Sequence, residues 1–290
     1  SEPFEPEWIW LKFAKLARKS HRPAISKLVM NNLRQKSSDN PSLDVTLGLL
    51  EQAWDLADRS RAIYQLRDLI ARVSPEPSAS PRSDSGNGFL AKCYCKLSNW
   101  LSTSRGDQDV SSQATMDEIL RYYLMATSLD RTSFRAWQGW ALTNLELAMA
   151  RDRGARITQL RHNPYILPAI QGLFRCISIE PSRSFEDVLR ILTLWFRFSN
   201  LPEVPAAVGD GASSIPIECW VPVIPQLIAR IHIPNPQTRR LLHHILVDIA
   251  KGFPHAIVYP LVVASKSPSV ARRTAAISIL EKVKACCPLV

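Results

Sequence analysis

The sequence predicts an all-α protein, a solenoid of helical hairpins that is tetratricopeptide-like in its first half and HEAT-like in its second half. Apolar residues recur at the 3.6-residue spacing of a helix along most of the chain, and the alternating pattern of strands is almost absent. Glycine is scarce, with 10 among 290 residues, and helix-forming residues dominate. Hydrophobic residues make up 46% of the chain, which is enough for a continuous core.

The stretch 121–142, RYYLMATSLDRTSFRAWQGWAL, is the clearest hairpin in the chain. Residues 130–133 interrupt the helical pattern, and Thr132 or Ser133 can cap the second helix by accepting its free backbone N–H groups. Small residues on the apolar faces favour a close approach of the two helices: Ala126, Ala136 and Ala141. This arrangement is typical of a tetratricopeptide hairpin of about 34 residues. Because one hairpin cannot bury its apolar face alone, we expect similar units on both sides.

The same periodicity predicts the helices that precede this hairpin. In chain order they are 7–19, 24–32, 45–57, 61–73 and 89–101. Polar loops are expected at 36–43 and 106–114. A longer loop is expected at 74–88, SPEPSASPRSDSGNG, whose Ser/Pro/Gly-rich composition is typical of a mobile segment.

The type of helical pair that the sequence predicts changes after a charged segment at 151–164. The helices predicted beyond it are 165–179, 184–198, 217–231, 238–252, 254–265 and 269–286, and two prolines should kink or restart the third of them. These pairs resemble HEAT repeats more than tetratricopeptide repeats. The sequence therefore predicts a tetratricopeptide-like part at 1–150, a loop or insertion site at 151–164, and a HEAT-like part at 165–290.

Charge and cysteine content limit the classes of partner and compartment. The net charge of +10 and the isoelectric point near 9.5 suggest an anionic partner, without choosing among nucleic acid, membrane headgroups and a small polyphosphate. None of the six cysteines forms a CxxC pair or zinc-type spacing, so we expect buried free thiols in a reducing compartment and no metal site. No signal peptide and no apolar run of about 20 residues is present, which predicts a soluble, cytoplasmic protein.

No set of residues in the sequence predicts catalysis. His244 and Asp248 are four residues apart on one helix, but no nucleophile accompanies them, so we interpret them as a helix-surface pair. Six tryptophans could stack on single-stranded nucleic acid, but their core spacing indicates packing: Trp54, Trp100, Trp137, Trp140, Trp195 and Trp220. A free-standing basic solenoid that binds RNA or DNA remains the alternative function.

Seven stretches together resemble the FAT domain of phosphatidylinositol-3-kinase-related protein kinases, in particular the target-of-rapamycin type. They are WLKFAKLARKSHR (10–22), KCYCKLSNW (92–100), YYLMATSLDRTSFRAWQGWA (122–141), AIQGLFRCIS (169–178), LRILTLWF (189–196), WVPVIPQLIARI (220–231) and AIVYPLVVASKS (256–267). The chain contains no Gly-rich phosphate loop, no HRD-like string and no DFG. The resemblance therefore implies a non-catalytic scaffold segment that clamps the kinase domain. The implied partners are that kinase domain, the rapamycin-binding segment of the same protein and a HEAT-repeat adaptor, in a dimeric complex that can sit at endomembrane surfaces such as the lysosome or vacuole.

Basic residues cluster on several predicted helices. Lys12, Lys15 and Lys19 lie on one face of the first helix. Lys92 and Lys96 are four residues apart and share a face of a later helix. Arg135 falls in the first turn of its helix. The resemblance implies an inositol hexakisphosphate pocket at Lys12, Lys19, Lys92, Lys96 and Arg135. Left unpaired and close together, these cations would repel one another and disfavour the folded state. A bound polyphosphate is therefore expected to act as a structural staple.

Overall fold

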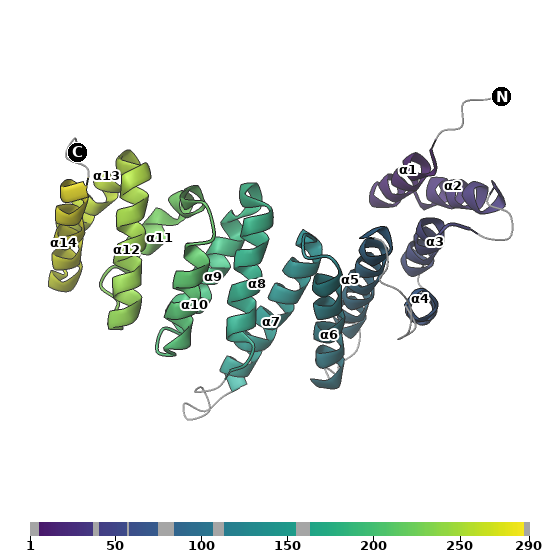
Figure 1. Ribbon diagram of the computed structural model, residues 1–290, viewed down its shortest axis with the longest axis horizontal. Coiled ribbons are helices and arrows are strands. Elements are labelled where there is room, and N and C mark those ends of the chain that lie inside the picture. Colours follow the sequence, from purple (N-terminus) through teal and green to yellow (C-terminus); the bar gives the residue numbers. More distant parts are fainter. Residues whose placement is uncertain are drawn as a thin grey trace. The chain divides into compact units, whose positions relative to one another are not determined.

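The structure is a computed structural model that describes residues 6–36, 41–56, 58–74, 84–106, 113–154 and 163–286 (Figure 1). These residues form α-helices with short 3-10 turns and contain no strand, which confirms the predicted all-α solenoid of helical hairpins. The chain divides into two compact units, Ser1–Arg131 (unit 1) and Thr132–Val290 (unit 2). Each unit is described separately.

Unit 1 is a stack of three helix pairs, in which α1 packs on α2, α3 on α4, and α5 on α6. The helices are α1 (Glu7–Lys19), α2 (Pro23–Lys36), α3 (Leu43–Asp55), α4 (Arg59–Val73), α5 (Asp84–Gly106) and α6 (Gln113–Leu129). A cluster of buried apolar residues joins the first three helices: Ala14, Val29, Met30, Leu33 and Val45. The predicted apolar face of α1 packs on its neighbours only in part, because Ala14 and Ala17 are buried whereas Trp8 and Phe13 are 55% and 45% exposed.

The corner between α1 and α2 is tight. His21 adopts a left-handed backbone conformation with φ of 55°, and the Arg22 N–H donates to the carbonyl of Ala17 at 2.9 Å. Pro23 then begins α2, where its missing N–H costs no hydrogen bond. The corner returns the chain antiparallel to α1 and brings both helices beside α3.

Unit 2 continues the helical pairs with α7 (Phe134–Gly154), α8 (Ile166–Ile179), α9 (Phe185–Arg197), α10 (Glu203–Ala212), α11 (Ile224–Ala229), α12 (Pro236–Gly252), α13 (Pro254–Ser265) and α14 (Val270–Cys286). Helix α9 shows why they form, because Val188, Ile191, Leu192 and Trp195 recur on one face and all four are buried. The helices α12, α13 and α14 pack on one another at one end of the unit (Figure 1).

Two features of unit 2 follow directly from residue type. A Cβ added to Gly172 of α8 would lie 2.8 Å from the Cβ of Ala141, so glycine lets α8 approach α7 closely. The proline-interrupted stretch predicted at 217–231 is a 3-10 helix, η3 (Ile217–Val223), followed by α11. This confirms a restarted helix, since proline removes a backbone donor and cannot continue the first segment.

Several boundaries differ from the predictions. Residues 84–88 belong to α5, so the expectation of a loop through position 88 is wrong for its last five residues, while 75–83 lie outside the described residues. The corner predicted at 130–133 is present, and Ser133 caps α7 by accepting from the Ala136 N–H at 3.4 Å. The helices that flank this corner, α6 and α7, belong to different compact units. The break predicted at 151–164 falls mostly outside the described residues, and the three-part domain division stays a prediction.

Within the described residues no single helix is long and apolar enough to cross a membrane. Only the pair 203–212 and 217–229, bent by 118°, reaches that length and composition together.

Candidate functional site

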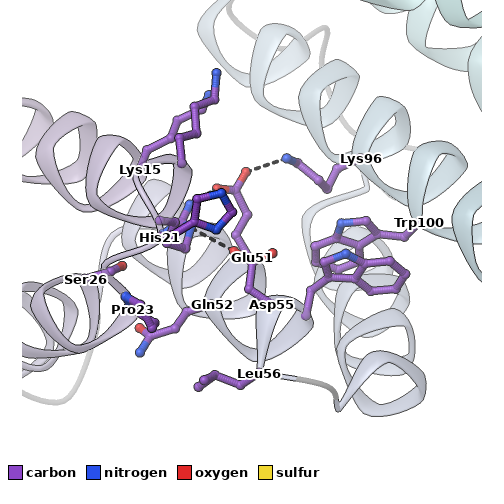
Figure 2. Close-up of a pocket in the computed structure, with 13 residues that line it drawn as sticks. Lys15, His21, Pro23, Ser26, Glu51, Gln52, Asp55, Leu56, Lys96 and Trp100 are labelled. Carbon is purple, nitrogen blue, oxygen red and sulfur yellow. Dashed lines mark hydrogen bonds and ion pairs between the residues drawn. The ribbon is translucent and has the colours of Figure 1, made fainter.

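Unit 1 contains a charged pocket of about 600 Å³ that is lined by α1, α3 and α5, with the start of α2 (Figure 2). Its charged lining residues are Lys15, Arg18, Lys19, Lys96, Glu51 and Asp55. Four permanent cations thus face two carboxylates, and His21 adds a titratable ring at the α1–α2 corner. The volume falls within the roughly 300–1,000 Å³ range of small-molecule sites.

Helical spacing explains how these side chains converge. Lys15, Arg18 and Lys19 lie at i, i+3 and i+4 on α1, so they share one face. Glu51 and Asp55 are one turn apart on α3, as Lys96 and Trp100 are on α5. Each helix therefore presents its charges to the pocket through a single face.

Glu51 lies at the centre of an ion-pair network. Its Oε1 accepts from the Lys96 Nζ at 2.7 Å, across the pocket from α5 to α3 (Figure 2). Arg18 donates to the other carboxylate oxygen of Glu51, and the Arg18 Nε lies 3.2 Å from the Asp55 Oδ2. The side chains of Arg18 and Glu51 are only 11% and 16% exposed, so their ion pair is largely shielded from water and salt, whereas Lys96 and Asp55 are more exposed. One carboxylate thus ties three helices together.

The two carboxyl groups respond differently to this environment. Burial alone would raise the pKa of Glu51, but the charges of Lys96, Arg18 and Lys15 together hold that pKa below its usual value. Burial raises the pKa of Asp55, and the nearby negative charge of Glu51 adds to this effect against the opposing charge of Arg18. Glu51 is therefore firmly ionised at neutral pH, and Asp55 is the easier of the two to protonate.

A stacked tryptophan pair and two buried polar groups complete the pocket lining. The rings of Trp54 and Trp100 are 4.7 Å apart and parallel to within 1°. Ser26 is fully buried, Gln52 is 9% exposed, and the Ser26 Oγ and the Gln52 Oε1 have no hydrogen-bond partner within the described part of the chain. Buried polar atoms without a partner are costly, so this lining has unused capacity for a polar ligand or for water.

The structure brings together some of the predicted site residues but not all of them. Lys19 and Lys96 line the pocket. Lys12 instead places its Nζ 4.5 Å above the ring of Trp8, and Lys92 lies 3.9 Å from the Asp44 carboxylate. Arg135 lies in the first turn of α7 and belongs to unit 2. Lys96 and Lys92 are not left unpaired, because Glu51 contacts the first and Asp44 the second, so the repulsion considered for unpaired cations is reduced at both.

Four charged residues of the pocket were not among the predicted site residues. Lys15 and Arg18 share the predicted basic face of α1, so the i, i+3, i+4 rule could have found them. Glu51 and Asp55 are one turn apart in a predicted helix, but nothing in the sequence tells that they face basic residues 33 or more positions away.

The other candidates behave as packing or surface residues. Trp195 and Trp220 are fully buried, and Trp54 stacks on Trp100, which agrees with packing rather than with platforms for bases. The His244 Nε2 lies 3.2 Å from the Asp248 carboxylate on the surface of α12, as a helix-surface pair should.

The prediction of buried free thiols holds for Cys93, Cys176 and Cys219, whereas Cys95 is only half-buried. Cys93 and Cys176 are free and buried, and burial raises the pKa of each thiol to about 12. Cys219 is also free and buried, and Cys95 is half-buried. Cys93 and Cys176 are therefore poor nucleophiles at neutral pH.

Comparisons with known proteins agree with this architecture. The sequence matches the family described as "FAT domain" over residues 4–193, and the family described as "Serine/threonine-protein kinase ATR-like, HEAT repeats" over residues 206–287. It is 32% identical to the serine/threonine-protein kinase TOR2 of Saccharomyces cerevisiae and 33% identical to the serine/threonine-protein kinase mTor of Drosophila melanogaster, with 98% of this chain aligned in each case. The chain spans only 14% and 12% of the length of these two relatives.

Solved structures show the same fold. The FAT and kinase domain of CtTel1 superposes with a TM-score of 0.72 at 15% identity, over 96% of this chain and 23% of that one. The open conformation of CtTel1 gives a TM-score of 0.71 at 16% identity, over 96% of this chain and 12% of that one. The second family match supports the HEAT-like character of the C-terminal half. From the matched residues, the relatives and the fold together, the chain belongs to the FAT domain family of the serine/threonine-protein kinases and contains no kinase domain of its own.

Proposed function

We propose that this chain is a non-catalytic scaffold of a target-of-rapamycin-type kinase, which supports the kinase domain as a clamp and holds inositol hexakisphosphate in the pocket of unit 1. The relatives are named as serine/threonine-protein kinases many times longer than this chain, and a CtTel1 chain with the same fold carries a FAT and a kinase domain together. The partners in this proposal are the kinase domain and the rapamycin-binding segment of the same protein, a HEAT-repeat adaptor and a second copy of the complex, in the cytoplasm.

The observation that carries the ligand proposal is the convergence of Lys15, Arg18, Lys19 and Lys96 on one pocket from α1 and α5. A compact polyphosphate presents many oxygens at short range and can accept charge-assisted hydrogen bonds from several of these groups at once. Lys19 forms no ion pair within the described residues, so it is available without breaking an existing contact. Lys96 and Arg18 already contact Glu51, so the ligand either shares these cations or displaces the carboxylate.

The proposed ligand acts as a staple because its contacts come from different helices. The pocket belongs to α1, α3 and α5, which lie in successive pairs of unit 1. A ligand that binds only the folded chain stabilises it by about 2.7 kcal/mol at 100 times its dissociation constant. For a chain of this size such a gain corresponds to a rise in melting temperature of roughly 4–5 °C.

Thermal melting with and without inositol hexakisphosphate tests this function. The parent chain and an Arg61→Glu control on α4, whose side chain is 70% exposed and outside the pocket, should both show the rise. Lys96→Glu should show little or none. Equal shifts in all three would mean diffuse charge binding. In that case a titration with single-stranded DNA at several salt concentrations, with a steep salt slope, would favour the nucleic-acid alternative.

A further inference from the structure

Unit 2 contains a second basic cavity, which is independent of the pocket in unit 1. It has a volume of about 350 Å³ and is lined by Arg239, Arg240, His243, His244, Val247 and Lys282. Positions 239, 243 and 247 are one turn apart on α12, and 240 and 244 follow on the adjacent strip of the same helix. Lys282 comes from α14, which packs on α12.

Three of the basic residues that line this cavity are not balanced by any carboxylate that the structure describes. No carboxylate lines it, and within the described part of unit 2 none of Arg239, Arg240 and Lys282 forms an ion pair with a carboxylate. Asp248, one turn beyond the cavity, pairs with His244 and Lys251 instead. Cations gathered in this way repel one another and disfavour the folded state unless an anion joins them.

Backbone contacts hold two of the cavity groups in place. The Arg239 Nη1 donates to the carbonyl of Ile233 at 3.2 Å, which fixes one edge of the guanidinium and leaves its other N–H groups for a ligand. His243 has its Nε2 2.9 Å from the carbonyl of Ile231, so that nitrogen carries the proton and donates. The turn before α12 thus holds the side chains of Arg239 and His243 beside each other in the free chain.

The protonation of His243 reflects the same surroundings. Burial lowers its pKa, the hydrogen bond to Ile231 partly opposes this, and the charges of Lys282 and Arg239 lower it further. A bound anion would oppose the effect of Lys282 and Arg239 and raise the pKa of His243. The ring of His243 therefore reports whether an anion is bound in the cavity.

We propose that this cavity is a binding site for a phosphate group. A planar arginine with a fixed edge, a second arginine and a lysine provide the donors that phosphate oxygens prefer. The small volume fits one or two phosphate groups rather than an extended polymer. The phosphate can belong to a soluble polyphosphate or to a lipid headgroup, since both present the same terminal oxygens.

Titration of the chain with inorganic pyrophosphate, followed by the nuclear magnetic resonance signals of the His243 ring, tests the site. We expect a saturable shift in the parent and an affinity for pyrophosphate that is about tenfold or more weaker in Lys282→Gln, because one charge-assisted hydrogen bond is lost. Lys284→Gln is the matched control, because Lys284 is exposed on the same helix but outside the cavity. Lys96→Gln in unit 1 should leave the response unchanged, which separates this site from the proposed function of that pocket.

Vesicles distinguish the two sources of the phosphate. A lipid headgroup is the ligand if the chain binds vesicles that contain a phosphatidylinositol phosphate more tightly than phosphatidylserine vesicles of equal charge. This extra binding must be lost in Lys282→Gln and kept in Lys284→Gln. A response to pyrophosphate without such binding assigns it to a soluble ligand. A parent chain without a saturable response, or an equal loss in Lys282→Gln and Lys284→Gln, would overturn the site.

Discussion

The Lys96 ammonium lies 2.7 Å from the Glu51 carboxylate, so the pocket of unit 1 contains its own competitor for an anionic ligand. Glu51 also binds Arg18, which means that one carboxylate neutralises two cations of the pocket. In the free chain this network connects α1, α3 and α5. In the proposed complex the polyphosphate takes over the same cations.

The first prediction concerns Glu51→Gln and has opposite signs for stability and for binding. Without ligand, the loss of the carboxylate leaves Arg18 and Lys96 without their shared partner, and we expect the free energy of unfolding to fall by about 1–3 kcal/mol. The affinity for inositol hexakisphosphate should rise at least about tenfold, because a negative charge beside the ligand is gone. Urea unfolding and calorimetry measure the two effects. A variant that is destabilised and also binds more weakly would contradict the competitor role.

The second prediction is the dependence of stability on acid. The pKa of Glu51 is lowered in the folded chain, so its stabilising contribution is present above its unfolded value of about 4.5 and is lost as the pH falls through the folded value. Asp55 has a raised pKa, so folding takes up a proton there, and its contribution has the opposite sign. Below pH 5 the loss of stability should be shallower in Glu51→Gln and steeper in Asp55→Asn than in the parent. Urea midpoints at several pH values measure how stability depends on pH in each chain. If both variants changed this dependence in the same direction, the opposite pKa shifts of Glu51 and Asp55 would be ruled out.

The third prediction tests the close approach of α7 and α8. In Gly172→Ala the new methyl group would lie 2.8 Å from the Ala141 Cβ and 3.3 Å from its Cα, so a helix must shift. We expect a steric cost of about 1–3 kcal/mol, which outweighs the roughly 1 kcal/mol that alanine gains over glycine within a helix. Gly88→Ala on α5 is the control, because nothing lies within 4 Å of its added Cβ, and it should be neutral or stabilising. The free energies of unfolding of the parent and the two variants test this prediction. A Gly172→Ala chain that is as stable as the parent would mean that the two helices are not in tight contact.

Helix positions could be predicted from the sequence because periodicity and proline act locally. The helices 7–19 and 254–265 have the predicted bounds, since a proline corner or a proline start marks their ends. The start of α5 could not be predicted in this way, because Asp84, Ser85 and Gly88 favour a loop by composition, yet all three lie in the helix. Local pattern thus predicts where most helices lie, but composition alone does not fix their ends.

The site could be predicted only in part, for a related reason. The basic faces of α1 and α5 are visible in the sequence, and Lys19 and Lys96 do meet in one pocket. Which turn of α1 faces the pocket depends on how α1 packs on α3, and this places Lys15 and Arg18 there while Lys12 lies over Trp8. The carboxylates of Glu51 and Asp55 come from a helix that carries no basic cluster, so only the folded chain reveals that they belong to the site.

The central claim is that one compact polyphosphate binds in the pocket of unit 1. Calorimetric titration of inositol hexakisphosphate into the parent chain, Lys96→Gln, Arg61→Gln and Lys282→Gln tests it most directly. The account predicts one tight site in the parent, retained in Arg61→Gln and Lys282→Gln and weakened about tenfold or more in Lys96→Gln. A parent without a saturable tight site, or a Lys96→Gln chain that binds as tightly as the parent, would contradict it.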